Sequence, residues 1–438
     1  MRLTSAACRA EPAQEGLGSF PLIPNSLRTK PDLKSALRTI RSMGELETLR
    51  EIWKSWPGTR ESDLDFFSSV VRSRGNDCRP HVIVLSRDER PDAILVGLSE
   101  RTKIPVKLGQ ITICQPQVNV LEFVHGSLRG TASDENCAAL VQQVMRWLDQ
   151  GEADLVLWEQ LDVDSPLYSY MLRSQRFPLR DHFLCPDDRW IMNFPKGLDA
   201  FLSSLCRSQR SKLHRKYQKV LNYFAGRIRV VQFRTGTDLD SAVSVMEEIA
   251  SKSEKRRSGF GFFDTPQVRE QMAIAARGGW LRIYVLYLED KPSAFWMGTL
   301  YDRCLQADHV GYDPVWARFS PGIFLFLNIL ESLQNADIET IDFGRGGSQL
   351  KQCFGALRRV EACAHIYAST VRGLQLSLLS AATHRATTLG RRIYCKEWAK
   401  RLLMNHFLRK RTEPALGRAA VSQWRSSRQT TPFVGGQR

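Results

Sequence analysis

Apolar side chains recur along this chain with two spacings, which predict an alternation of strands and helices. Between residues 46 and 56 they fall three or four positions apart, as on one face of a helix. The runs 81–85 and 93–98 flank the polar segment 86–91 and predict a hairpin. Further elements predicted in this half are a strand near 118–124, a helix over 136–148 and a strand over 153–158.

The second half begins with a long helix predicted over 198–224, with one apolar and one basic face. The elements predicted after it are strand 228–233, helix 239–251, a helix starting at Asp264, strands 281–288, 293–300 and 305–310, helix 322–336, strand 340–343, a short helix around 349–354 and strand 362–369. This order predicts an α/β fold with a mixed sheet flanked by helices. Because the first half shows a similar, weaker order, we expect two copies of one fold.

Length and composition suggest how the chain is divided. With 438 residues, 43% hydrophobic and 25% charged, it is long enough for about two globular domains. We expect a flexible lead over residues 1–42, an N-terminal domain over 43–195, a C-terminal domain over 196–370 and a basic, partly helical tail over 371–438.

The net charge of +16 is concentrated in the tail, which holds fourteen Lys and Arg against two Glu. Such a tail suits an anionic membrane or another polyanion, and the amphipathic spacing over 391–408 suits a helix on a membrane surface. Ten scattered cysteines without a CxxC pair favour a reducing, cytoplasmic compartment and disfavour a metal site. No stretch reaches the ~18 uninterrupted apolar residues of a membrane span.

The start of the helix after residue 320 is the first candidate site. Ser320, Pro321 and Gly322 precede an apolar run, and glycine at such a position lets a ligand approach the backbone. Free amides and the positive end of the helix dipole suit a pyrophosphate there. Arg318 stands just before this start. The same residues also fit an ordinary capped core helix.

The glycine-rich turn after strand 340–343 is the second candidate site. Asp342 supplies a carboxylate at the strand end, and Gly344, Arg345 and Gly346 could wrap a ligand. Lys351, on the next helix, could stabilise an oxyanion or a phosphate. The triplet Asp-Phe-Gly also occurs in kinases, but this sequence lacks a kinase's HRD-type loop and glycine-rich strand.

The strand end from residue 308 to 314 supplies candidate acid–base groups. Asp308, His309 and Asp313 could take a proton from an attacking amine or hydroxyl. Tyr312 could protonate a leaving thiolate. The sequence leaves the three possible bases unranked.

The order of these features resembles the GNAT-type acyltransferases. It is closest to the branch that includes the Fem-type peptidyl transferases and the CelD-like proteins of exopolysaccharide and cellulose biosynthesis. The motif of that branch matches at Asp342, Phe343, Gly344, Gly346, Lys351, Phe354 and Gly355 and departs at Ser348 and Leu350. The resemblance covers residues 198–369 well and 45–195 loosely. It implies two tandem GNAT-like domains, of which the second carries the donor site.

The resemblance also implies a reaction. The donor would be acetyl-CoA or another acyl-CoA, with its pyrophosphate at residues 320–322, and no metal would take part. Transfer would go directly to a small-molecule or glycan acceptor of cell-envelope or exopolysaccharide biosynthesis. Arg207 and Arg210, on the basic helix, would contact an anionic acceptor. Two alternatives remain, namely a Fem-type transferase with charged tRNA as donor and a non-catalytic scaffold docked to a membrane.

Overall fold

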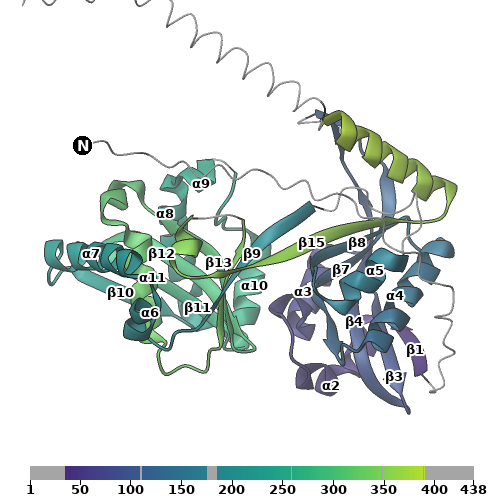
Figure 1. Cartoon of the computed structure of the whole chain (residues 1–438), viewed down its shortest axis with the longest axis horizontal. Helices are drawn as coiled ribbons and strands as arrows, with labels where there is room; N and C mark the ends of the chain where they lie inside the picture. The colour runs from purple at the N-terminus through teal and green to yellow at the C-terminus, as the bar shows by residue number, and fades with distance from the viewer. Residues whose placement is uncertain are drawn as a thin grey trace, which may run out of the picture.

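The computed structural model describes residues 35–108, 111–174, 185–257, 259–346, 349–387 and 389. They form two lobes of similar build that share one large mixed sheet (Figure 1). The strand order is β1-β3-β4-β7-β8-β15-β9-β14-β13-β12-β11-β10, with β2 paired to β4. The predicted α/β class, with a mixed sheet flanked by helices, is confirmed, but the sheets of the two halves are joined into one.

The N-terminal lobe follows the predicted order closely. Its elements are β1 (Ser35–Ile40), α1 (Met43–Glu47), α2 (Arg50–Ser55), η1 (Arg60–Ser62), α3 (Leu64–Ser73), β2 (Cys78–Pro80), β3 (Val82–Arg87), β4 (Arg90–Lys103), β5 (Val106–Leu108), β6 (Ile111–Cys114), β7 (Gln117–Gly130), α4 (Asp134–Asp149), β8 (Leu155–Asp162) and α5 (Pro166–Ser174). The prediction of a flexible lead is wrong for residues 35–42, because β1 pairs with β3 and buries Ile40. Residues 1–34 lie outside the described part.

The C-terminal lobe contains the segment from which the candidate chemistry was predicted. Its elements are β9 (Cys185–Asn193), α6 (Leu198–Ser204), α7 (Arg207–Tyr223), β10 (Ile228–Phe233), η2 (Gly236–Asp238), α8 (Leu239–Lys252), α9 (Glu254–Arg257), α10 (Pro266–Arg277), β11 (Leu281–Leu288), β12 (Lys291–Tyr301), β13 (Cys304–Tyr312), η3 (Pro314–Phe319), α11 (Pro321–Ser332), β14 (Thr340–Arg345), α12 (Gln349–Cys353) and β15 (Leu357–Tyr367). The single helix predicted over 198–224 is two helices, because Leu205 and Cys206 have extended backbone.

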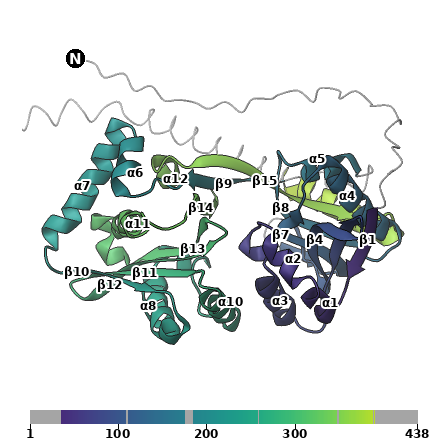
Figure 2. The ribbon, with the colours of Figure 1, turned by 90° about the horizontal axis from the view of Figure 1, so that it is seen from below.

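Each lobe is a sheet between two layers of helices (Figure 2). In the C-terminal lobe, α6, α7 and α11 pack on one face around a core that includes Phe201, Phe324 and Phe326, while α8 and α10 pack on the other face. In the N-terminal lobe, α4 and α5 cover one face and α1 to α3 the other. α11 is buried on almost every side, so its start is held rigidly against the sheet.

The lobes are joined through two strands that cross between them. β9 comes before residue 195, yet it pairs with β14 and β15 of the C-terminal lobe. β15 pairs with β9 over 357–363 and then with β8 of the N-terminal lobe over 361–367. The division of the chain at residue 195 stays a prediction, and the sheet runs across it.

The parallel strands β13 and β14 separate soon after they meet. They pair only where Cys304 to Gln306 faces Thr340 to Asp342, and β13 then continues to Tyr312 beside β12 alone. A bulge in β13 leaves Asp308 without a partner on β12, between Ala307 and His309. Opposite this bulge stands Gly298, where an added Cβ would lie 1.9 Å from the carbonyl oxygen of Gln306. Glycine is therefore required for this geometry.

Residues 371–387 form a helix that follows β15. The helix predicted over 391–408 lies outside the described residues. No helix within the described ranges is long and apolar enough to cross a membrane.

Candidate functional site

The start of α11 is open to solvent at Gly322. Ser320 has left-handed backbone (φ 54°, ψ 54°), its amide donates to the carbonyl of Ala317 at 3.0 Å, and its own carbonyl accepts from Ile323 and Phe324. Gly322 is exposed, an added Cβ would meet nothing within 4 Å, and its amide has no hydrogen-bond partner among the described residues. One free amide therefore points out at the positive end of a buried helix.

Two cationic side chains lie beside this helix start. Lys219 of α7 donates from Nζ to the carbonyl of Arg318 at 2.8 Å and lies 5.2 Å from the ring centre of Phe319. The guanidinium of Arg318 lies 4.7 Å from the same ring and 5.7 Å from that of Tyr223. Their charges add to the helix dipole, so the local field favours an anion. Of the two, the sequence predicted only Arg318.

The glycine turn after β14 is fixed by Lys351. Gly344 and Gly346 have positive φ, of 72° and 87°, which glycine adopts without strain. Nζ of Lys351 donates to the carbonyls of Gly344, Arg345 and Gly346 at 3.0, 2.9 and 3.1 Å. Burial lowers the pKa of this ammonium, and the Asp342 carboxylate opposes part of that shift. These contacts use all three donors of Lys351, and its catalytic role stays a prediction.

Asp342 is an internal ion-pair partner. Its side chain is buried and accepts from two nitrogens of Arg189 and, at 2.8 Å, from the amide of Gly344. Arg345, by contrast, is exposed. Of the predicted substrate-binding residues in this turn, Asp342 faces the protein interior, while Gly344, Arg345 and Gly346 are accessible.

The candidate acid–base groups on β13 differ in their surroundings. Asp313 accepts from the amide of Val315 at 3.0 Å and pairs with Lys252 at 3.1 Å, so it caps η3. Tyr312 is 45% exposed at the end of the strand. The ring of His309 packs edge-on against Phe262. Burial lowers the pKa of His309, which keeps the imidazole neutral near pH 7.

Asp308 occupies the bulge and faces the N-terminal lobe. Its Oδ2 accepts from Nη1 of Arg60 at 2.6 Å. Burial raises the pKa of Asp308, although the guanidinium of Arg60 acts in the opposite direction. A cavity of about 70 Å³ opens beside the pair, and it is lined from both lobes by Arg60, Phe66, Val268, Gln271, Met272, Ala275, Leu281, Met297, Thr299, Asp308 and His309.

The pair belongs to a buried polar network that the sequence analysis missed. Nη2 of Arg60 donates to Glu61 at 2.8 Å, and Glu61 lies 3.4 Å from Nδ1 of His125. Arg189 lies 2.8 Å from the other ring nitrogen of His125 and pairs with Glu361 as well as with Asp342. These residues come from segments far apart in the chain. The one local signal was Glu361, a charged residue between Val360 and Ala362 in β15.

The two predicted contacts on α7 lie away from this centre. Arg210 donates from Nη2 to the carbonyls of Ser203 and Leu205, so it caps α6. Arg207 is exposed at the first residue of α7. It lies about 18 Å along the helix axis from Lys219, at 1.5 Å per residue. The structure therefore does not bring these arginines to the start of α11.

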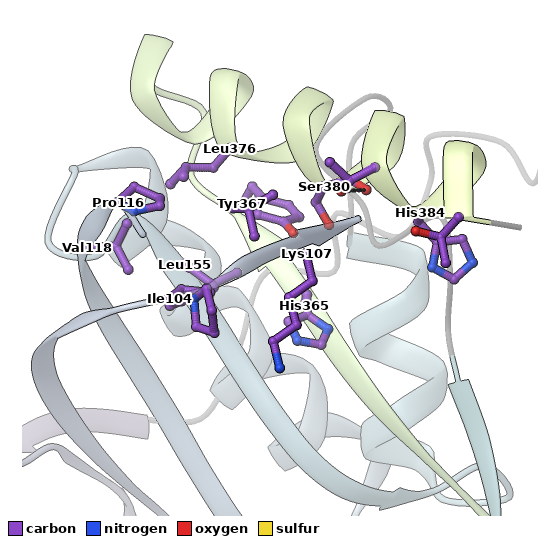
Figure 3. A pocket seen from close by; sticks show the side chains of 14 residues that line it. Ile104, Lys107, Pro116, Val118, Leu155, His365, Tyr367, Leu376, Ser380 and His384 are labelled. Carbon is purple, nitrogen blue, oxygen red and sulfur yellow. Dashed lines mark hydrogen bonds between the residues drawn. The ribbon is translucent and has the colours of Figure 1, made fainter. Parts of the chain in front are cut away.

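A larger cavity, of about 330 Å³, lies in the N-terminal lobe beneath helix 371–387 (Figure 3). It is lined by Ile104, Pro105, Val106, Lys107, Pro116, Val118, Leu155, His365, Tyr367, Leu376, Ser380, Thr383, His384 and Thr387. None of the predicted site residues lines it, and Val118 and Leu155 lie near the starts of β7 and β8. It is therefore remote from the place where β13 and β14 separate.

A protein-family model and several solved structures resemble parts of this chain. Residues 207–352 match the acetyltransferase (GNAT) domain family. The chain carries a GNAT acyltransferase domain. This segment contains α11 and its start, the separation of β13 and β14, and the glycine turn. The predicted acyltransferase class is confirmed, and the predicted branch within it stays a prediction. No curated protein matches the chain.

Solved structures resemble most of the chain. A crystal structure of FemX covers 76% of this chain and 97% of its own, with 12% identity and a TM-score of 0.52. The C-terminal domain of a putative lysylphosphatidylglycerol synthetase from Agrobacterium fabrum covers 78% and 96%, with 13% identity and a TM-score of 0.47. A tandem GNAT protein from the clavulanic acid biosynthesis pathway covers 76% and 99%, with 11% identity and a TM-score of 0.41. At these identities the likeness concerns the fold alone.

Within the described part of the chain, no group of three or more His, Cys, Asp or Glu side chains is placed to hold a metal ion.

Proposed function

We propose that the GNAT domain transfers an acyl group from acetyl-CoA, or another acyl-CoA, to an amine or hydroxyl acceptor. The observation that carries this proposal is the open start of α11, where the free amide of Gly322 lies at a helix terminus flanked by Lys219 and Arg318. A pyrophosphate is the ligand that such a site suits. Beyond Gln306 the edge of β13 that faced β14 is no longer paired, so its backbone groups are available to the rest of the donor.

The corresponding helix of the N-terminal lobe does not suit an anion. α4 begins with Asp134 and Glu135, and the hydroxyl of Ser133 accepts from the amide of Asn136 at 3.2 Å. Two carboxylates at a helix start repel a phosphate group, and the cap uses a donor that a ligand would need. We therefore assign a single donor site, in the C-terminal lobe.

Asp308 is the base that the geometry favours. Asp313 caps η3, and the ring of His309 packs against Phe262. Asp308 lies two residues beyond the last pair of β13 with β14, where the thioester would sit, and burial raises its pKa, which makes the carboxylate a stronger base. The acceptor lone pair attacks the thioester carbonyl carbon, and its proton moves to Asp308. The C–S bond breaks and the thiolate leaves with the electron pair, to be protonated by Tyr312 or by Asp308.

The acceptor is proposed from the resemblance to the CelD-like proteins. It is a small molecule or glycan of cell-envelope or exopolysaccharide biosynthesis. The exposed residues Arg345 and Gly346 of the glycine turn, together with half-buried Gly344, are the proposed acceptor contacts.

Calorimetry with acetyl-CoA tests the donor site. Gly322→Trp should weaken acetyl-CoA binding by at least about tenfold, or ~1.4 kcal/mol of binding free energy, because the indole blocks the site. The fold should tolerate the indole, since a side chain at this position meets open space. Gly236→Trp is the matched control, since it places the same ring in open space at η2. Equal binding by wild type and both variants would place the donor elsewhere. No binding of any acyl-CoA by the wild type would reject the donor class.

A charged tRNA is the second candidate donor, and the exposed cations of α7 favour it. Arg207, Lys212, Arg215 and Lys216 are all exposed on this helix. They would engage phosphates, so binding should weaken steeply with salt. To show that charged tRNA is the donor, an experiment must detect transfer of its aminoacyl group to an acceptor, because binding alone is not sufficient. If charged and uncharged tRNA bind with the same affinity, and the protein also binds acetyl-CoA, this candidate is rejected.

We also propose peripheral association with an anionic membrane. The exposed apolar side chains of helix 371–387 and residue 389 repeat along one stripe, formed by Val371, Leu374, Leu378 and Leu389. On the β5–β6 hairpin, Ile111 and Ile113 are also exposed. The basic sequence after this helix provides charge complementary to anionic lipid. The amphipathic segment 391–408 of the predicted tail lies outside the described residues.

A further inference from the structure

In each lobe a pair of parallel strands separates, and the two points of separation face each other between the lobes. β7 and β8 pair in parallel up to Phe123 and Trp158, and His125 lies two residues beyond that pair. Asp308 lies two residues beyond Gln306, the last residue of β13 that pairs with β14. Both strands also carry a bulge near this point. Arg60 and Glu61, from η1, fill the space between the two positions.

The element η1 is tethered from several sides. The indole nitrogen of Trp53 and a guanidinium nitrogen of Arg129 donate to the carbonyl of Ser62 at 2.8 and 2.9 Å. The hydroxyl of Thr59 donates to the carbonyl of His125 at 2.8 Å. These bonds tie η1 to α2 and to β7, so the backbone at Arg60 is held in place.

Both terminal nitrogens of the Arg60 guanidinium are held by hydrogen bonds. It donates to Glu61 at 2.8 Å, to the hydroxyl of Thr299 at 3.2 Å and to Asp308 at 2.6 Å, and it lies 5.0 Å from the ring centre of Phe66. Glu61 is itself bonded by Gln306 at 3.3 Å. A planar fork fixed in this way can set the orientation of the carboxylate that it contacts.

One nitrogen of Arg60 has no partner in the described part of the protein. Its Nε is buried and has no hydrogen-bond partner among the described residues. Arg60 and Asp308 both line the 70 Å³ cavity between the lobes. A buried donor without a partner is rare in proteins and is usually satisfied by a water or a bound group.

We infer that Arg60 is a positioning residue, which holds Asp308 towards this cavity so that the N-terminal lobe completes the acid–base site of the GNAT domain. The inference rests on the proposed function. It gives the N-terminal lobe a role in the reaction, although its own helix start does not suit the donor. Asp308 acts on the acceptor proton, and Arg60 acts through Asp308.

The variants Arg60→Ala, Arg60→Lys and Asp308→Asn test this role, with Arg50→Ala as the control. Arg50 pairs with Glu47 and Asp65 on the outside of the same lobe. All variants should bind acetyl-CoA like the wild type. With acetyl-CoA and glucosamine as the acceptor probe, Arg60→Ala should lose on the order of 10²-fold in kcat through misplacement of the base. Arg60→Lys should recover part of this loss, and Arg50→Ala should be unaffected.

A titration of Asp308 separates positioning from a merely structural role. The charges that face this carboxyl are Arg60, Glu61 and Asp342. Since Arg60 lowers the pKa of Asp308, its removal should raise that pKa further and move the acid limb of the pH–rate profile upwards. The pKa is read from the carboxyl-carbon resonance of protein labelled with [13C]aspartate, assigned with Asp308→Asn. This readout needs no acceptor, so it decides the matter even if glucosamine is not acetylated.

Two outcomes overturn the inference. One is an Asp308 pKa that does not change in Arg60→Ala. The other is an Arg60→Ala enzyme that keeps the wild-type kcat and acid limb, with only a lower melting temperature. Failure of the proposed function is distinct, because the wild type itself would then not bind acetyl-CoA.

Discussion

At the scale of single residues, the role of each polar side chain depends on which other side chains it contacts. Asp342 and Lys351 were predicted from a motif, yet in the structure one pairs with Arg189 and the other ties down a turn. Asp308 was one of three unranked bases, and its partner Arg60 lies in a different lobe. The sequence identifies which polar residues stand at strand ends. It does not show which distant charges meet them, because that follows from how the two lobes pack.

The contacts of Lys351 predict a local stabilising role. Lys351→Ala removes three charge-assisted hydrogen bonds to carbonyls of the glycine turn and should lower the free energy of unfolding by about 1–3 kcal/mol. Chemical denaturation measures this loss, and calorimetry should show acetyl-CoA binding within about twofold of the wild type. A variant of wild-type stability that loses turnover would restore the catalytic role predicted from the sequence.

The network around Arg189 predicts a pH-dependent loss of stability. Arg189→Met leaves the buried carboxylate of Asp342 without its cation and leaves Glu361 with His125 alone, which costs about 3–5 kcal/mol. Burial acts to raise the pKa of Glu361, but His125 and Arg189 hold it below its usual range. In the wild type, the stabilisation that comes from the lowered pKa of Glu361 is present above the pKa that Glu has in the unfolded chain. It is lost as the pH falls through the pKa of Glu361 in the folded protein.

In Arg189→Met the pH dependence should reverse in part, because unpaired buried carboxyls gain from protonation. The destabilisation relative to the wild type should therefore be larger at pH 8 than at pH 5 in urea unfolding. Arg74→Met is the control, since Arg74 also joins two glutamates, Glu100 and Glu122, but at a partly exposed site. Its loss of stability should be about 1 kcal/mol. Equal losses for both arginines at both pH values would contradict this account of the network.

At the scale of elements, strands and helices with a clear period were predicted well. The strand over 281–288 is found with the predicted bounds, because each side chain along it has a defined face of the sheet. β1 was missed, since a six-residue strand has little periodicity of its own and is defined by its pairing with β3. The helix over 198–224 is interrupted at Leu205 and Cys206, where the apolar spacing gives no warning.

The stripe on helix 371–387 predicts binding to anionic vesicles. Leu378→Glu removes an exposed leucine, which contributes about 1.5–3 kcal/mol when buried, so affinity for phosphatidylglycerol vesicles should fall by about tenfold or more. Gln375→Glu changes the charge equally on the same helix and should have a smaller effect. Flotation of the full chain measures both. If the two variants float alike, charge alone explains any binding, and the stripe plays no part.

At the scale of the whole molecule, the two lobes depend on each other. β9 lies between β14 and β15, and β15 ends beside β8. A fragment of residues 196–370 therefore lacks the central strand of its own sheet and should fail to unfold cooperatively, unlike the full chain. Circular dichroism during thermal unfolding is the measurement. A sharp transition in the fragment would show that the division at residue 195 separates autonomous domains. The alternation of elements predicted two similar halves, whereas the crossing strands, which depend on long-range pairing, could not be predicted.

Amide hydrogen exchange with and without acetyl-CoA tests the central claim most directly, because it locates the donor on the unmodified chain. The account predicts slower exchange in the peptide that spans residues 320–324, where the free amide of Gly322 would gain a partner. It predicts no change at residues 133–137, the acidic start of α4. Protection at α4, or protection that leaves the start of α11 unchanged, would contradict it.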